Sequence, residues 1–109
     1  MSLPIPFDLA AMRESAASAC ALLRVLGNQD RLLLLCQLTT GPLCVSELQS
    51  ALGIAQPTLS QQLGVLREEG LVSTRRNGKQ IYYSIASAEA LAVMAVLYQH
   101  YCQPKEQAA

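Results

Sequence analysis

The most constraining feature of the sequence is a pair of short amphipathic segments separated by only three residues. Hydrophobic residues at three- and four-residue spacing predict helices over residues 45–52 and 56–69, with Gly53 to Ala55 between them. Pro57 falls in the first turn of the second segment, where the missing N–H of proline is tolerated. Two helices joined by so tight a turn match the DNA-binding helix-turn-helix, whose second helix enters the major groove.

The hydrophobic pattern changes its period after residue 70. Residues 71–76 and 79–85 are strand-like, and the Asn77-Gly78 pair between them is a strong hairpin signal. In a two-residue type I′ turn both central residues need a positive φ, which asparagine and glycine tolerate best. We therefore expect a hairpin to flank the two helices as a wing.

Further helices are expected on both sides of this unit. Asp8 and Asn28 are placed as N-caps of helices over residues 8–26 and 28–38, and a last helix is expected over residues 87–101. The predicted fold class is mostly α with a small β-hairpin wing, a dimeric winged helix-turn-helix.

The chain has 109 residues, enough for one domain, and half of them are hydrophobic, enough for a core without disulfides. We expect a single domain over residues 1–109 with an ordered core at 8–102, after a loose lead-in at 1–7 and before a loose tail at 103–109. Within it the helix-turn-helix is expected at about 45–69 and the wing at about 71–85.

The last predicted helix contains nine consecutive apolar residues, Ala90 to Tyr98, and has no polar face there. A helix that is apolar all round must be buried all round, which so small a domain cannot achieve with its own terminal helix. We therefore expect a homodimer whose interface is built from the helices at about 8–26 and 87–102. Val93 and Val96 are expected to face the partner.

The second helix of the pair has one buried stripe, formed by Leu59, Leu63 and Leu66. At about 100° per residue, Gln61 then faces away from the core and is free to contact base edges. Basic residues bracket the wing turn, where they suit the sugar-phosphate backbone. The residues expected to bind DNA are Gln56, Thr58, Ser60, Gln61, Arg67, Arg75, Arg76, Asn77 and Lys79.

Composition argues against several classes of function. The net charge of zero excludes a polycation but allows a local basic patch. One histidine, no paired carboxylates and no glycine-rich phosphate loop argue against an enzyme, and we expect no cofactor. The apolar run is shorter than the roughly 20 residues that span a membrane, and the amino terminus lacks a secretion signal. A cytoplasmic protein with reduced cysteines is expected.

These elements in this order resemble the arsenic-repressor (ArsR/SmtB) family over about residues 8–102. The resemblance rests on four motifs: Leu26 to Leu32, Ser46 to Leu48, Gln56 to Val72, and a wing ending in Tyr82-Tyr83. It implies a dimer that leaves double-stranded operator DNA when an inducer binds. The family often has histidine where this chain has Gln62, a departure that bears on base preference.

Both standard metal sites of that family are missing here. Arsenic- and lead-sensing members have a Cys-Val-Cys motif, whereas this chain has Cys44-Val45-Ser46. Zinc- and nickel-sensing members use several ligands along the last helix, whereas this chain offers His100 there, with Glu89 eleven residues earlier. We therefore assign no metal site.

The positions of Cys36 and Cys102 instead resemble the persulfide- and redox-sensing branch of the family. The resemblance implies that these two residues form a disulfide or polysulfide bridge when a small sulfur species or an oxidant acts as inducer. Release by a thiophilic ion such as arsenite remains an alternative, and so does a winged-helix module that contacts proteins.

The residues alone favour burial for two cysteines. Cys20 lies in an alanine-rich helix and Cys36 follows four leucines, settings in which cysteine behaves as a small hydrophobe. Cys44 follows Gly41-Pro42, where exposure is expected, either as inert packing or as a remnant of a metal site.

Overall fold

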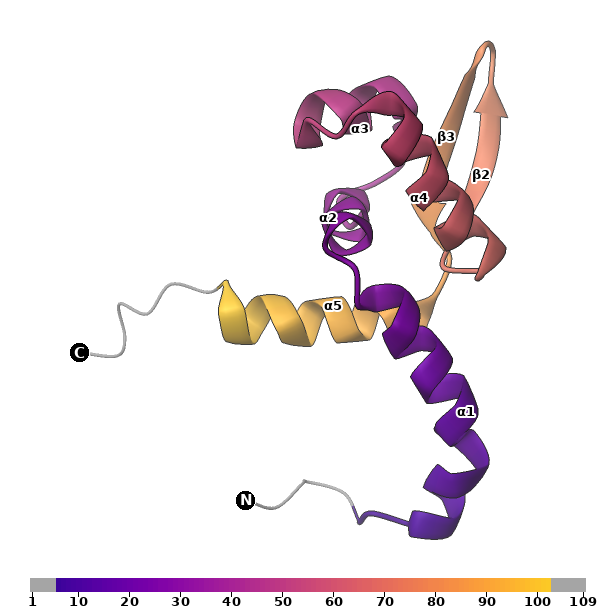
Figure 1. Cartoon of the computed structure of the whole chain (residues 1–109), viewed down its shortest axis with the longest axis vertical. Coiled ribbons are helices and arrows are strands. Elements are labelled where there is room, and N and C mark those ends of the chain that lie inside the picture. Colours follow the sequence, from indigo (N-terminus) through magenta and orange to yellow (C-terminus); the bar gives the residue numbers. More distant parts are fainter. Residues whose placement is uncertain (1–5, 103–109) are drawn as a thin grey trace, which may run out of the picture.

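A computed structural model describes residues 6–102 and gives the winged helix-turn-helix fold predicted from the sequence (Figure 1). The helices are α1 (Leu9–Leu26), α2 (Gln29–Leu38), α3 (Val45–Leu52), α4 (Gln56–Glu68) and α5 (Ala88–Tyr101). The strands are β1 (Leu43–Cys44), β2 (Val72–Asn77) and β3 (Gln80–Ile85). The predicted tail at 103–109 and residues 1–5 of the predicted lead-in lie outside the described residues.

Side-chain caps fix the starts of three helices. The Asp8 carboxylate accepts a hydrogen bond from the Ala10 N–H at 3.0 Å, and the Asn28 amide oxygen accepts one from the Arg31 N–H at 3.0 Å, as the N-cap assignment predicted. Ser87 caps α5 in the same way, through Ala90. Each cap satisfies an N–H that has no partner within the helix and contributes about 1 kcal/mol.

The core lies between α2, α3 and α4. Its largest fully buried side chains are leucines: Leu34, Leu35, Leu48, Leu59, Leu63 and Leu66. The stripe predicted for the second helix of the pair is therefore confirmed. Because three leucines of α4 are anchored in this core, the opposite side of α4 is fixed toward solvent.

The sheet has three strands in the order β1-β3-β2, all antiparallel. The sequence analysis predicted β2 and β3 but no β1, since a strand of two residues is too short to show an alternating pattern. Leu43 of β1 lies opposite Tyr83 of β3, so the base of the wing is joined to the start of α3.

The wing turn differs from its prediction. Asn77 pairs with Gln80, which leaves Gly78 and Lys79 as the two turn residues in place of Asn77-Gly78. Gly78 has a φ of 67°, and no described non-glycine residue has a positive φ. Glycine at the first central position is what a type II′ turn requires, so this turn needs one residue with positive φ where type I′ needs two.

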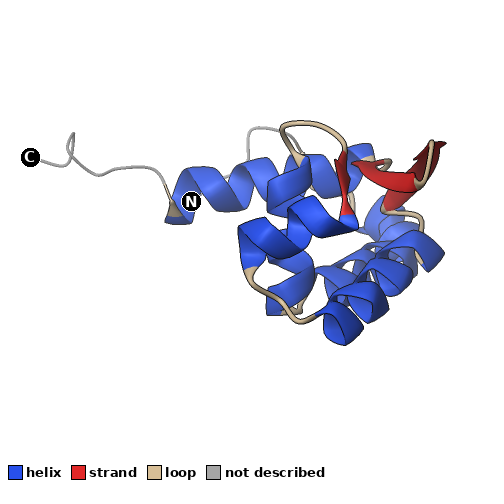
Figure 2. Ribbon diagram, turned by 90° about the horizontal axis from the view of Figure 1, so that it is seen from above, coloured by secondary structure: helices blue, strands red, loops and turns tan. Residues whose placement is uncertain are grey.

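The helices α1 and α5 project from the core in different directions (Figure 1). The carboxyl-terminal end of α5 and the wing lie at opposite ends of the molecule (Figure 2). Apolar side chains of both helices are exposed: Leu9, Met12, Leu23, Leu91, Val96, Tyr98 and Tyr101. Val93 is an exception to the prediction, because it packs against the core of its own chain. No helix in the described part is long and apolar enough to cross a membrane.

Candidate nucleic-acid interface and cysteine site

The first two turns of α4 present short polar side chains on the side opposite the core. Gln56, Ser60 and Gln61 are exposed and Thr58 is half-buried. The Gln56 amide donates to the Ser60 hydroxyl at 3.0 Å, which orders both side chains along one edge of the helix. Gln61 is the one that faces directly away from the buried leucines of α4.

The wing carries the basic residues. Arg75, Arg76 and Lys79 are all exposed, as is Asn77. Neighbouring residues of a strand point to opposite faces of the sheet. Arg76 shares the face of Val72, which packs into the core, whereas Arg75 lies on the other face, opposite Tyr82. The two arginines therefore cannot make the same contact.

Arg76 is also the more constrained of the two side chains. Its Nε donates to the carbonyl oxygen of Gly78 at 3.3 Å, which holds the guanidinium against the wing turn. Lys79 occupies the turn itself, and Arg67 is exposed in the last turn of α4. Four of the eight basic residues of the chain thus lie along the wing and at the end of α4.

The structure adds a contact that sequence reasoning missed. Arg31, in the first turn of α2, donates through one terminal nitrogen to the Gln62 amide oxygen at 2.8 Å. Its Nε donates to the carbonyl oxygen of Val25 at 2.6 Å, and its other terminal nitrogen to that of Arg24 at 3.4 Å. Gln62 was noted only as a departure from a family histidine, and nothing in the pattern around Arg31 marks a partner 31 residues away.

Cys36 is exposed, so the expectation that it is buried is wrong. The leucines beside it explain this, because Leu34, Leu35 and Leu38 occupy the core side of α2 and leave Cys36 on the opposite side. Cys36 lines a cavity of about 650 Å³ between α2 and α5, whose α5 side includes Tyr98 and Gln99.

Cys102 follows α5 directly and is exposed. Its backbone N–H donates to the Tyr98 carbonyl oxygen at 2.8 Å, the last hydrogen bond of the helix. Cys102 does not itself line the cavity beside Cys36, but Tyr98, one turn earlier, does. Both cysteines are exposed, and the last turn of α5 runs from the cavity beside Cys36 to Cys102.

The expectations for the two other cysteines are also wrong. Cys44 is 4% exposed, because β1 pairs with β3 and sets Cys44 opposite Tyr82. Its N–H donates to Glu47 at 3.0 Å and its sulfur lies 3.2 Å from the Ser46 hydroxyl, so it is built into the start of α3. Cys20 is exposed on α1 within the single chain.

Within residues 6–102 no cluster of three or more histidine, cysteine or acidic side chains could hold a metal ion. Glu89 and His100 lie in the first and last turns of α5. Within one chain these two residues are therefore too far apart along the helix to share an ion.

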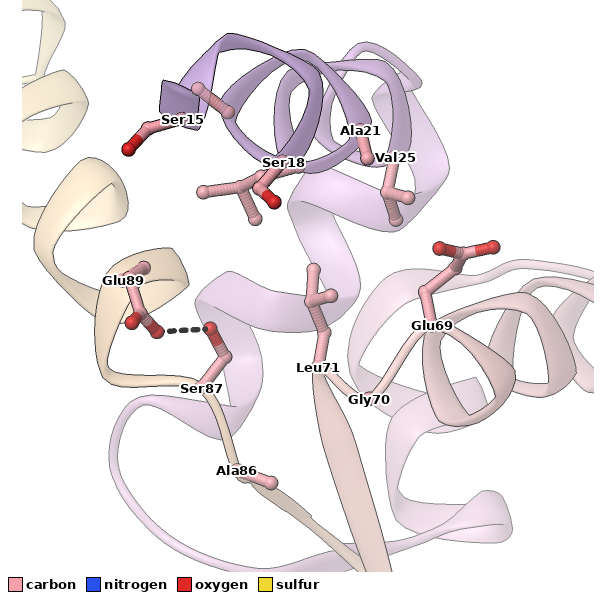
Figure 3. A pocket seen from close by; sticks show the side chains of 12 residues that line it. Ser15, Ser18, Ala21, Val25, Glu69, Gly70, Leu71, Ala86, Ser87 and Glu89 are labelled. Carbon is pink, nitrogen blue, oxygen red and sulfur yellow. Dashed lines mark hydrogen bonds between the residues drawn. The ribbon is translucent and has the colours of Figure 1, made fainter. Parts of the chain in front are cut away.

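A second hollow, of about 740 Å³, lies between α1, the base of the wing and the start of α5 (Figure 3). Its walls are mostly small side chains, and Glu69 and Glu89 border it from two different elements. The Ser87 hydroxyl is 3.3 Å from a Glu89 carboxylate oxygen. Two carboxylates repel phosphate, which argues against nucleic-acid binding in this hollow.

Comparison with known proteins identifies the family of the chain. Residues 28–74 match the family described as "Bacterial regulatory protein, arsR family". The chain is 46% identical over 104 residues to the biofilm growth-associated repressor of Agrobacterium fabrum, covering 95% of this chain and 86% of that protein.

Two solved structures have the same fold. The transcriptional repressor BigR of Xylella fastidiosa is 45% identical, with a TM-score of 0.85, over 90% of this chain and all of that one. A homodimeric winged helix-turn-helix DNA-binding domain from Mycobacterium bovis is 28% identical, with a TM-score of 0.67, over 94% of each chain. The chain therefore belongs to the arsR family of bacterial regulatory proteins.

Proposed function

We propose that this protein is a dimeric DNA-binding transcriptional repressor of the cytoplasm, released from its operator when Cys36 and Cys102 become linked through sulfur. The observation that carries the proposal is the polar outer side of α4, held by a leucine core next to a wing that bears three cations. Amides and hydroxyls suit base edges, and the cations suit phosphates.

Dimerisation is proposed through α1 and α5, which present apolar side chains that the single chain leaves exposed. A relative of the same fold is described as a homodimer. A twofold axis places two copies of α4 about one helical turn of DNA apart, which fits an inverted-repeat operator.

The proposed switch is thiol chemistry between α2 and the end of α5. A persulfide RSSH and the two thiols yield a Cys36–Cys102 disulfide, the thiol RSH and H₂S, so that the cysteines are oxidised and the persulfide is reduced. Both thiols are exposed, and Cys36 opens on a cavity beside α5. A bridge requires Cα atoms within about 4.4–6.8 Å, so it fixes α5 against α2.

The arsenite alternative has less support than the thiol switch. It would centre on Cys44, which is buried and whose neighbours in the structure are Glu47 and Ser46. A thiophilic ion at that position would have to displace contacts that start α3.

The proposal is tested by selecting duplexes from a randomised library with the purified protein and measuring affinity by fluorescence anisotropy. We expect an inverted repeat to be enriched, and its affinity to fall after treatment with a persulfide donor and to recover with dithiothreitol. If no duplex is enriched, the winged-helix module that contacts proteins takes the place of the repressor.

Gln61→Ala should weaken binding to the selected duplex by about 1–3 kcal/mol, the value of one bidentate base contact. Binding to a scrambled duplex should hardly change, because Gln61 contacts a base and not the backbone. Competition between the two duplexes measures the difference. Equal affinities of parent and variant for the selected duplex would show that Gln61 faces away from the bases.

Arg75→Ala and Arg76→Ala should each weaken binding to selected and scrambled duplexes alike. Each arginine that neutralises a phosphate contributes about 0.9 to the slope of log affinity against log salt, so each loss should reduce that slope by about one. Because the two side chains lie on opposite faces of the wing, the double variant should show the sum of both changes. An unchanged slope in either single variant would remove that arginine from the interface.

A further inference from the structure

Arg31 is the side chain that joins the end of α1 to α4. Its guanidinium donates to the carbonyl oxygens of Val25 and Arg24, where α1 ends, and to the amide oxygen of Gln62 in α4. The carbonyl end of a helix carries partial negative charge, which favours a cation there. The planar guanidinium thus has three acceptors from two other helices, a geometry that the single ammonium group of lysine cannot reproduce.

This contact determines which end of the Gln62 amide is free. Arginine has only donors, so the group that faces it must be the amide oxygen. The Gln62 NH₂ group has no hydrogen-bond acceptor among residues 6–102. A glutamine that is free to rotate can present either end of its amide, whereas in this arrangement Gln62 presents its NH₂ group.

Gln62 is also placed near the candidate interface. It lies four residues after Thr58, on the same flank of α4, and it directly follows the outward-facing Gln61. Both Thr58 and Gln62 are half-buried, which is typical of side chains at the edge of an exposed helical surface.

We propose that Arg31 is a positioning residue for DNA recognition, holding the Gln62 amide by its oxygen so that its NH₂ group donates to an acceptor on the operator. The acceptor is a phosphate oxygen or the acceptor edge of a base. This inference rests on the proposed DNA binding and adds to it a link between α4 and the helix expected to form the dimer.

The test is a double-mutant cycle with the selected duplex. Gln62→Met removes the donor and leaves Arg31 in place, while Arg31→Lys keeps the charge and loses the three-way contact. Each should weaken binding about tenfold, which is at the strong end for a hydrogen bond to a neutral base and at the weak end for one to a charged phosphate. The double variant should also lose about tenfold, well short of the hundredfold product of independent effects.

Gln61→Met is the matched control, because Gln61 has no contact with Arg31. Combined with Arg31→Lys, it should give the full product of the two single effects. Arg31→Met, which removes the charge, should keep the salt slope of the parent, and this result separates positioning from direct attraction between Arg31 and a phosphate. Comparison of selected and scrambled duplexes identifies the acceptor: equal losses for Gln62→Met indicate a phosphate, and a loss on the selected duplex alone indicates a base.

Two results would overturn the inference: parent-like binding by Arg31→Lys, or a full product of effects for Arg31→Lys with Gln62→Met. Circular dichroism melting shows whether each variant is folded at the assay temperature. Should Arg31→Lys fail to fold, Gln62→Met decides alone, since parent-like binding by that variant also refutes the proposal. A parent protein that enriches no duplex would refute the proposed function and this inference together.

Discussion

Replacing Val96 with aspartate is expected to convert the dimer to monomers and to reduce operator affinity by at least a hundredfold. Val96 lies in the apolar stretch of α5 and is 53% exposed in the single chain, so its substitution leaves the chain's own core intact. In the proposed interface the aspartate would be buried without a partner, which strongly disfavours association. A monomer binds each half-site separately. It therefore loses the gain in affinity that comes from linked binding to two half-sites, which is about 10²–10⁴-fold.

Sedimentation velocity measures the mass of the variant, and anisotropy its affinity. Gln49→Asp is the control for sedimentation, since Gln49 is exposed on α3 and lies outside both proposed interface helices. Val93→Asp should instead destabilise the fold, because Val93 packs against the core. A Val96→Asp protein that sediments as a dimer with parent affinity would place the interface elsewhere.

Replacing either Cys36 or Cys102 with serine is expected to abolish release by a persulfide while leaving DNA binding intact. Serine retains the size and exposure of the side chain but cannot form a bond to sulfur. In the parent, linkage should lower affinity by about 5- to 150-fold, the usual range of allosteric coupling. Intact mass should show the loss of two hydrogen atoms, with additional sulfur where a polysulfide forms.

Cys20→Ser is the matched control, because Cys20 is also exposed but lies on α1. It should respond to the persulfide as the parent does. Continued release of Cys36→Ser by persulfide would exclude the Cys36–Cys102 pair as the switch. Titration with arsenite would then be the next measurement, because it tests the alternative centred on Cys44.

The sequence was sufficient to predict a helix where its hydrophobic pattern repeats over several helical turns. Leu59, Leu63 and Leu66 recur at helical spacing, so both the existence of α4 and its buried side could be predicted. The wing was predicted from its turn residues, but its register was off because Gly78 can serve in either of two turn types. A shift of one residue changes every cross-strand pair in a hairpin.

Burial and contacts that depend on how distant segments pack together could not be predicted. The burial of Cys44 follows from the pairing of β1 with β3, two segments far apart in the sequence. The exposure of Cys36 depends on which face of a leucine-rich helix meets the core. The contact between Arg31 and Gln62 joins two half-buried polar side chains, which leave no hydrophobic periodicity to detect.

The exposed apolar side chains of α5 also affect how the occupancy of the operator depends on the number of protein copies in a cell. Tyr101 is 79% exposed and Tyr98 is 52% exposed in the single chain, so their burial in the proposed dimer would link stability to protein concentration by mass action. At low copy number the free chains would be mostly apart. An operator with two half-sites holds two chains at an effective concentration in the millimolar range, far above that in solution. The operator then acts as a template for assembly, and its occupancy rises with the square of the chain concentration.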